Sequence, residues 1–348
     1  MQNDGFKSIC RALHQNSTLT KLSVVGEIIW DAAAIANMLL ENVTLEYLNL
    51  EHNEIDDHGV VLFESALAHN STLQTLILDC NKILNAMPLF KGLRTNTGLR
   101  TVSLWSNYVG NISIIEFARA LHQNHSLKSA CLHDTYFKID GARALGDALQ
   151  VNASLNSLDI ANNEFGPLAA DFIAMGLENN LCLTTLDISM NRISDDGANS
   201  IGRALHTNSH LQVLYMSDNW IRHGSITLAN ALKTNSSLHT MILCKNGIDD
   251  DGAISFSEAL MINTTLTILN LGGNGITNIG ASKLANALLS NTDLKTLDLQ
   301  RNRLDPVQDV ALFAEALNVN KTVDVILWVN EYKRYRCQWP TMSNAWTR

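Results

Sequence analysis

The sequence predicts an α/β solenoid, a right-handed horseshoe with a parallel β-sheet on its concave face and helices on its convex face. The first observation is the pattern L-x-x-L-x-L-x-x-N-x-I, formed by Leu266, Leu269, Leu271, Asn274 and Ile276. The second is its recurrence at an interval of about 28 residues, because the same pattern starts at Leu238 before it and at Leu294 after it. The third is a run of apolar and small residues between the frames, such as 280–288, which suits a helix. One strand–helix unit cannot bury its leucines alone, so stacked units share a continuous core.

Frames of this kind recur along the chain, most of them at this same interval. Their twelve first positions are Leu19, Leu45, Leu73, Leu99, Leu127, Leu155, Leu183, Leu211, Leu238, Leu266, Leu294 and Val323. The alternation of apolar and other residues in each frame predicts a short strand with one buried face. The register places six of these strand residues in the core: Leu186, Ile188, Leu214, Met216, Leu269 and Leu271.

Two asparagine positions recur with the leucines. The first is the Asn of the leucine pattern, which we call the consensus Asn. Nine of the twelve frames keep it, and Glu27, Thr135 and Glu331 replace it in the others. A buried side-chain amide needs hydrogen-bond partners, so we expect this Asn to form hydrogen bonds with backbone groups in the turn. A second Asn, three residues before the first leucine, creates the Asn-x-Ser/Thr sequences at Asn16, Asn42, Asn70, Asn124, Asn152, Asn235, Asn263 and Asn320. We interpret it as a helix-ending or turn residue and not as a glycosylation site.

We assign residues 1–330 to one repeat domain with an N-terminal cap helix at 5–16. Residues 331–348 form a C-terminal cap or tail. Its main aromatic residues are Tyr332, Tyr335, Trp339 and Trp346. Covering the last core layer is the favoured interpretation of this tail, and binding of a partner is the alternative. In the third repeat, Pro88 and a step between frames that is shorter than most predict a shortened helix.

Composition and charge narrow the class of protein. The chain is 46% hydrophobic and 17% charged, which is typical of a folded, soluble domain. Its formal net charge of -9 argues against non-specific nucleic-acid binding, which requires a basic surface. No apolar run reaches the roughly 18 residues that suggest a membrane helix. The six cysteines form no C-x-x-C pair, so we expect free thiols, no disulfide and a cytoplasmic location.

The repeats carry the L-x-x-L-x-L-x-x-N frame, to varying quality, in eleven of twelve positions, and several helices begin with Asp-Gly-Ala. In these features the chain resembles the ribonuclease-inhibitor-like class of leucine-rich repeat proteins, up to about residue 330. Similar members include the ribonuclease inhibitor, the sensor halves of NOD-like receptors, the Ran GTPase-activating protein and effectors that bacteria inject into host cells. The resemblance implies the fold strongly and says little about function. It carries no functional residues over to this chain.

Residues between and just after the leucines are expected to face the concave surface. Trp105, Tyr108, His133 and Tyr136 come from adjacent repeats and should cluster there, surrounded by acidic residues. Trp and Tyr are enriched at interface hot spots, so this cluster is the expected centre of a binding surface. The predicted partner-binding residues are Glu51, His52, Asp79, Trp105, Tyr108, His133, Asp134, Tyr136, Asp159, Asp187, Tyr215, Asp218 and Trp220.

No motif indicates catalysis, a cofactor or a metal ion. Cys131, His133 and Asp159 lie on adjacent predicted strands, but an open sheet excludes little water and offers no evident oxyanion hole. Surface variation explains the pairs His52–Asp79 and His133–Asp159 better than metal binding does. We therefore predict no enzyme activity, no cofactor and no metal site.

The sequence thus predicts a monomeric, non-enzymatic scaffold that binds a protein on its concave face. The partner is expected to offer an apolar anchor within a basic rim, and neither nucleic acid nor membrane is expected as a partner. One alternative is a regulator of a small GTPase, which arranges its partner's own catalytic machinery. Another is the ligand-sensing fragment of a larger NOD-like receptor, or an injected bacterial effector.

Overall fold

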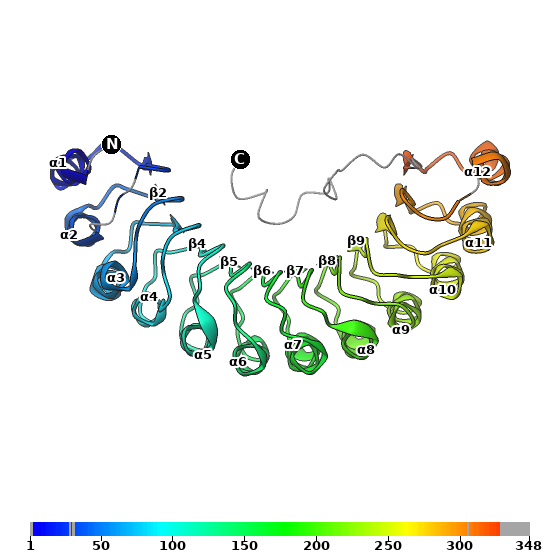
Figure 1. Ribbon diagram of the computed structural model, residues 1–348, viewed down its shortest axis with the longest axis horizontal. Coiled ribbons are helices and arrows are strands. Elements are labelled where there is room, and N and C mark those ends of the chain that lie inside the picture. The colour runs from blue at the N-terminus through cyan, green and yellow to red at the C-terminus, as the bar shows by residue number, and fades with distance from the viewer. Residues whose placement is uncertain (1–2, 28, 30–31, 305, 328–348) are drawn as a thin grey trace. The chain divides into compact units, whose positions relative to one another are not determined.

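The computed structural model of the protein describes residues 3–27, 29, 32–304 and 306–327. The chain divides into two compact units, Met1–Asn163 and Glu164–Arg348. Each unit alternates one short strand with one helix (Figure 1). The predicted fold class, an α/β repeat solenoid with a parallel sheet, is confirmed. The predicted C-terminal cap at 331–348 lies outside the described residues.

Strands and helices of the first unit follow the predicted frames. Its helices are α1 (Asn3–Leu13), α2 (Ala32–Glu41), α3 (Asp57–His69), α4 (Met87–Leu93), α5 (Gly110–Leu121) and α6 (Ile139–Leu149). Its strands are β1 (Lys21–Ser23), β2 (Tyr47–Asn49), β3 (Thr75–Ile77), β4 (Thr101–Ser103), β5 (Ser129–Cys131) and β6 (Ser157–Asp159). The predicted cap helix at 5–16 corresponds to α1, which ends three residues earlier than expected.

The second unit repeats the same elements. Its helices are α7 (Pro167–Asn179), α8 (Ser194–Thr207), α9 (Gly224–Leu232), α10 (Asp250–Leu260), α11 (Asn278–Leu288) and α12 (Pro306–Val319). Its strands are β7 (Thr185–Asp187), β8 (Val213–Tyr215), β9 (Thr240–Ile242), β10 (Ile268–Asn270), β11 (Thr296–Asp298) and β12 (Val325–Leu327).

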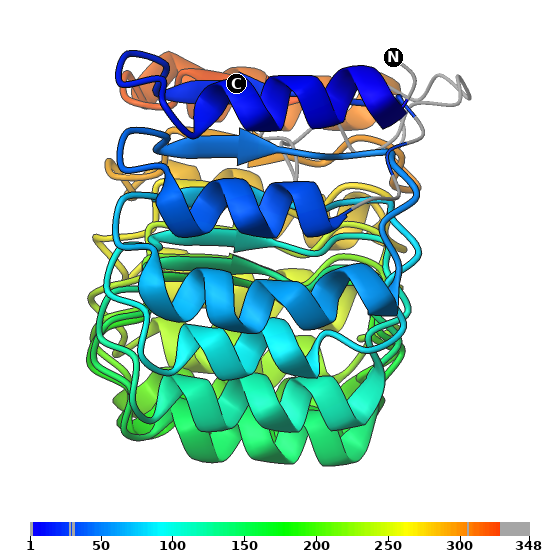
Figure 2. The ribbon, with the colours of Figure 1, turned by 90° about the vertical axis from the view of Figure 1, so that its left-hand side faces the viewer.

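Within each unit the strands form one face and the helices the other. Consecutive strands pair in parallel, β1 to β6 in the first unit and β7 to β12 in the second. Equivalent residues pair across the repeats, as Leu48 does with Leu76 and Leu76 with Val102. Figure 2 shows the helices of the first unit stacked side by side. We call the surface formed by the strands and the turns that follow them the strand face.

The core lies between the strands and the helices, as the leucine pattern requires. The six predicted core residues are each 0% exposed: Leu186, Ile188, Leu214, Met216, Leu269 and Leu271. Their burial confirms the predicted register. Helix α4 has 7 residues with Pro88 in its first turn, and is the shortest of the helices in the described part of the chain. The predicted shortening in the third repeat is therefore confirmed.

The consensus Asn links each repeat to its neighbours. The side-chain nitrogen of Asn81 donates to the carbonyls of Leu50 and Leu78, both at 2.9 Å, and its oxygen accepts from the Ile55 N–H at 3.0 Å. Thr135 takes the same position in the fifth frame, where its hydroxyl donates to the Leu132 carbonyl at 2.7 Å. These bonds satisfy backbone groups that the turn leaves unpaired inside the protein. The predicted role of this Asn is confirmed.

The second recurrent Asn ends the helices. The side-chain nitrogen of Asn263 donates to the carbonyls of Leu232 at 2.7 Å and Asn235 at 2.9 Å. Its oxygen accepts from the backbone N–H of Leu266 at 2.7 Å and of Thr265 at 3.0 Å. Asn263 is only 6% exposed. Since its amide nitrogen is buried and bonded, the structural interpretation of this position is confirmed.

Replacing Asn263 by Ala should lower the free energy of unfolding by roughly 1–3 kcal/mol, because buried carbonyls and N–H groups lose their partners. Asn16 is the matched control, since it occupies the same repeat position but is exposed. Asn16→Ala should cost less than about 1 kcal/mol. Urea unfolding followed by circular dichroism measures both values. Equal losses at the two positions would contradict a role that depends on bonding to the preceding repeat.

The expectation that every cysteine is a free thiol is wrong at one position. Cys244 is disulfide-bonded. The cysteines without a disulfide are Cys10, Cys80, Cys131 and Cys182. Cysteines on strands two or more repeats apart cannot bridge one another, because their Cα atoms exceed the limit of about 7 Å. Cys337 lies outside the described residues.

Candidate functional site

The candidate site is built on a turn that recurs after the strands. We call the position of the consensus Asn, which Thr135 occupies in the fifth frame, the consensus position. The residue directly before it has a positive φ in ten successive frames, at His52, Cys80, Ser106, Asp134, Asn162, Met190, Asp218, Lys245, Gly273 and Arg301. This backbone conformation is uncommon for residues other than glycine. Backbone hydrogen bonds between repeats hold the turn in this conformation. The His52 N–H donates to the Asp79 carbonyl at 2.9 Å, and the Cys80 N–H donates to the Trp105 carbonyl at 2.7 Å. Equivalent side chains of neighbouring repeats are thereby aligned about 5 Å apart at the backbone.

The structure brings the predicted aromatic residues together in two pairs within the first unit. The rings of Tyr108 and Tyr136 stack with centroids 4.3 Å apart and an interplanar angle of 15°. The Trp105 and His133 rings meet edge to face, with centroids 5.9 Å apart. The tyrosines are 58% and 46% exposed, whereas Trp105 and His133 are half-buried. We call these four residues the aromatic cluster.

The stacked tyrosines occupy what we call the edge position, the residue directly after the consensus position. Other edge positions also pair with their equivalents in the next repeat. In the first unit, Lys82 forms an ion pair with Glu54. In the second unit, Arg192 forms an ion pair with Glu164, and its guanidinium lies 5.4 Å from the centroid of the Trp220 ring. Trp220, a predicted site residue, is 61% exposed. The Arg192 guanidinium lies close enough to its ring for a cation–π contact.

Three predicted site residues are not solvent-facing, contrary to expectation. Asp79 is 5% exposed, and Asp159 and Asp187 are each 0% exposed. Asp159 and Asp187 lie inside strands, where they pair in register with Cys131 and Tyr215. Side chains on neighbouring parallel strands stand about 5 Å apart and cover one another, even on a face that is open as a whole.

The buried acids within the strands have a structural role. Asp159 accepts a hydrogen bond from the Ala161 N–H at 3.0 Å, and Asp187 accepts one from the Ser189 N–H at 2.9 Å. Asp or Asn at this strand position bonds the N–H two residues on in other repeats too, at Asn49, Asn270 and Asp298. Such local bonds are typical of Asp and Asn in turns. The recurrence of Asp or Asn between the last two leucines was the sequence signal for this role.

Asp79 is an ionisable group of the strand face whose pKa is shifted from its usual value. Burial raises the pKa of its carboxyl from the usual 3.8 to about 6, and the nearby acids Glu51 and Asp159 add to this. Hydrogen bonds from the Ser103 hydroxyl at 2.5 Å and the Trp105 N–H at 2.9 Å act in the opposite direction, because they favour the charged form.

This shift predicts a pH-dependent effect of Asp79→Asn. The Asp79 pKa is higher in the folded protein, so the unfolded chain releases this proton first as the pH rises, and the folded state loses stability between about pH 4 and pH 6. The variant avoids this loss. Its free energy of unfolding, relative to the unmodified protein, should rise by up to about 3 kcal/mol between about pH 4 and pH 8. Urea titrations across this range measure the difference, and a difference that does not change with pH would contradict the assignment.

The remaining predicted residues are at least partly accessible. In the first unit, Glu51 and Asp134 are half-buried and His52 is exposed. Asp134 accepts hydrogen bonds from the Ser106 hydroxyl at 3.2 Å and the Asn162 amide at 3.1 Å. In the second unit, the last two predicted residues are half-buried: Tyr215 and Asp218. Burial, with the neighbouring Asp187, raises the pKa of Tyr215.

Sequence reasoning missed two pairs of neighbouring side chains, one in each unit. Cys80 lies beside His52, which belongs to the preceding repeat, and Arg192 lies beside Trp220, which belongs to the following repeat. In each case the two residues occupy the same position of successive repeats. Reading equal positions across neighbouring frames, for pairs of residue types that interact, would have found both.

Comparison with known proteins agrees with the repeat seen in sequence and structure. A family model described as leucine-rich repeat matches residues 41–63, 151–174, 179–202, 207–222, 263–285 and 290–307. This chain is a leucine-rich repeat protein. Its repeats are of the ribonuclease-inhibitor-like type, in which each strand is followed by a helix. Families of this kind typically bind proteins and are typically non-enzymatic.

Relatives of this leucine-rich repeat protein cover part of the chain. This chain is 30% identical over 150 residues to the NACHT, LRR and PYD domains-containing protein 3 of Bos taurus. The aligned segment covers 41% of this chain and 14% of that protein. The chain is 28% identical over 168 residues to the ribonuclease inhibitor of Sus scrofa, which is 38% of this chain and 37% of that protein. The chain thus spans well under half the length of both relatives.

A solved structure matches nearly the whole chain. An internalin from Listeria monocytogenes superposes with a TM-score of 0.55 over 94% of this chain and 96% of its own, at 19% sequence identity. At this identity the likeness concerns the fold alone. Among the described residues, no helix combines the length and apolar character needed to cross a membrane.

Proposed function

We propose that this leucine-rich repeat protein is a non-enzymatic scaffold that binds a protein partner through the strand face of its first unit. The observation that carries the proposal is the aromatic cluster, above all the stacked and exposed pair Tyr108–Tyr136. Neither ring is needed to fill the core, since about half of each remains in solvent. Exposed aromatic side chains that are already paired lose little conformational freedom on binding, which favours their use as anchors.

The charges near the aromatic cluster favour a partner with an apolar anchor and basic residues around it. Asp134 lies two residues before Tyr136 and is held by hydrogen bonds from Ser106 and Asn162. Partly exposed carboxylates of this kind act mainly on association rate and selectivity. Asp159 is buried and accepts a hydrogen bond within its own turn, so it contributes to the surface of the first unit by supporting the backbone.

Affinity capture from a lysate, followed by quantitative mass spectrometry, tests the proposal. The double variant Tyr108→Ala/Tyr136→Ala should lose a discrete set of captured proteins while its circular dichroism spectrum is unchanged. Val61→Ala is the matched control, because Val61 is 55% exposed on helix α3 of the same unit. Captured proteins that are retained by the double variant and lost from the control would place the interaction on the helix face.

A regulator of a small GTPase is the alternative function that can be tested directly. The scaffold proposal predicts that the protein does not accelerate GTP hydrolysis by any member of a panel of GTP-loaded small GTPases. Single-turnover phosphate release with and without the protein measures this. An increase of about tenfold or more in any member, which is well below the effect of known activators, would replace the scaffold proposal.

A further inference from the structure

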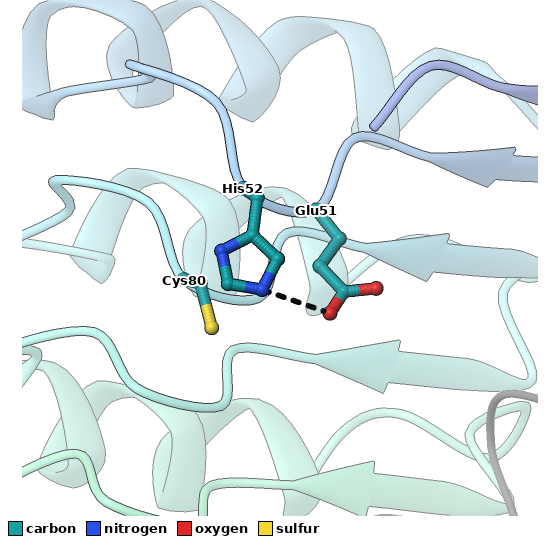
Figure 3. Close-up of side chains that lie close together, drawn as sticks. All are labelled: Glu51, His52 and Cys80. Atoms are coloured by element: carbon teal, nitrogen blue, oxygen red, sulfur yellow. Dashed lines mark ion pairs between the residues drawn. The ribbon is translucent and has the colours of Figure 1, made fainter. Parts of the chain in front are cut away.

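The structure brings a glutamate, a histidine and a cysteine together in two adjacent repeats of the first unit. Glu51 and His52 follow β2, and Cys80 follows β3 at the same turn position as His52. One ligand atom from each, a carboxylate oxygen, an imidazole nitrogen and the thiol sulfur, lie within 4.8 Å of one another. Figure 3 shows the three side chains lying close together. Nε2 of His52 lies 3.4 Å from Oε1 of Glu51.

These three donors are of the types that bind zinc in proteins. Thiolate, imidazole and carboxylate all coordinate Zn²⁺, and three protein ligands with one water are typical of zinc sites that stay open to solvent. A tetrahedral zinc ion with bonds of roughly 2.0–2.3 Å holds its ligand atoms roughly 3.3–3.8 Å apart. The distance of 3.4 Å between the His52 nitrogen and the Glu51 oxygen is already in this range, and the Cys80 sulfur lies within 4.8 Å of both atoms. We propose that Glu51, His52 and Cys80 form a zinc-binding site.

The backbone holds the three residues in place without a metal ion. The His52 N–H donates to the Asp79 carbonyl at 2.9 Å, and the Glu51 N–H donates to the Asn49 side chain at 2.9 Å. Both His52 and Cys80 have positive φ values, 55° and 52°, as the repeated turn requires. Because ligands held by rigid elements lose little freedom on binding, the turn preorganises the site.

The charge around the thiol favours a cation. Burial raises the pKa of the Cys80 thiol to about 11, and the nearby carboxyl groups of Asp79, Glu51 and Asp134 add to this, so zinc must displace the thiol proton when it binds. A divalent ion bound here would reduce the repulsion among these groups. The His52 side chain is 59% exposed, so the site can be reached from solvent. It is separate from the aromatic cluster in its residues, and the zinc proposal does not depend on the proposed partner.

Zinc titration of the tag-free full chain tests the proposal, after chelator treatment and under mild reduction. Competition with a chromophoric chelator should show one tight Zn²⁺ site per chain. Cys80→Ser and His52→Ala should each weaken binding by at least about tenfold. With Co²⁺ as the probe, the unmodified protein should show a thiolate-to-metal charge-transfer band that Cys80→Ser lacks.

Two control variants keep the result specific. Cys182→Ser removes a cysteine of the second unit, and His58→Ala removes an exposed histidine of α3, so neither should change zinc affinity. His52→Ala also serves as the second ligand variant if Cys80→Ser does not fold, because the exposed His52 ring is not part of the core. The proposal is overturned if no tight site is found, if both ligand variants bind zinc as the unmodified protein does, or if the cobalt spectrum lacks the thiolate band.

Discussion

Replacing Leu269 by Ala should lower the free energy of unfolding by about 2–5 kcal/mol. Leu269 is 0% exposed and pairs in register with Met241 on one side and Leu297 on the other, which are also fully buried. A cavity at this position removes contacts with two neighbouring repeats, and the short strands give little room to close it. Each repeat is stabilised mainly by its neighbours, so the loss should lower the stability of several repeats together.

Urea unfolding followed by circular dichroism measures this effect, with Ile279→Ala as the control. Ile279 lies on helix α11, which follows strand β10 in the chain, but it is 62% exposed. The control should lose less than about 0.5 kcal/mol. A loss at Leu269 as small as that of the control would contradict the register on which the site rests.

Replacing Trp105 by Ala should weaken binding of the partner by about 2 kcal/mol or more, roughly 30-fold in affinity, while folding is retained. The Trp105 side chain is half-buried and its ring meets the edge of His133, so it presents a fixed apolar surface. Its backbone N–H bond to Asp79 does not involve the ring and is kept by Ala.

Calorimetry with the captured partner measures the loss, with Val61→Ala as the control for an exposed apolar side chain elsewhere in the unit. A folded Trp105→Ala protein that binds with unchanged affinity would move the proposed surface to another part of the chain. Unfolding of the variant would instead show that Trp105 belongs to the core.

The fold was predictable because the same pattern of buried strand residues recurs many times along the chain. Most frames place two buried apolar residues in the strand and an Asn in the turn that follows, so the register could be read by aligning the frames. The cluster of Tyr108 and Tyr136 was predictable for the same reason, since equal positions of successive repeats become neighbours.

Exposure of single side chains was harder to predict than their position. The frame places Asp159 and Asp187 on the strand face, but their neighbours on adjacent strands bury them completely. Burial there depends on the size of side chains in the next repeats, which the alternation of one strand does not include. Reversal of these acids to Lys is therefore expected to disrupt folding, because it buries an unpaired charge.

Side-chain pairs formed between two successive repeats were also missed. His52 and Cys80 come from successive repeats and match no compact metal motif, so only the stacking of repeats shows them to be neighbours. The disulfide of Cys244 was missed because the expectation of free thiols rested on the absence of a C-x-x-C pair, which excludes only one kind of cysteine pairing.

A photo-crosslinking amino acid placed at position 108 or at position 61 tests the central claim most directly. Position 108 belongs to the aromatic cluster, and position 61 is exposed to a similar degree on helix α3. The account predicts that irradiation in cell lysate yields a discrete crosslinked protein from position 108 and none from position 61. Crosslinking from position 61 alone, or from neither position while capture of the partner is intact, would contradict binding through the strand face of the first unit.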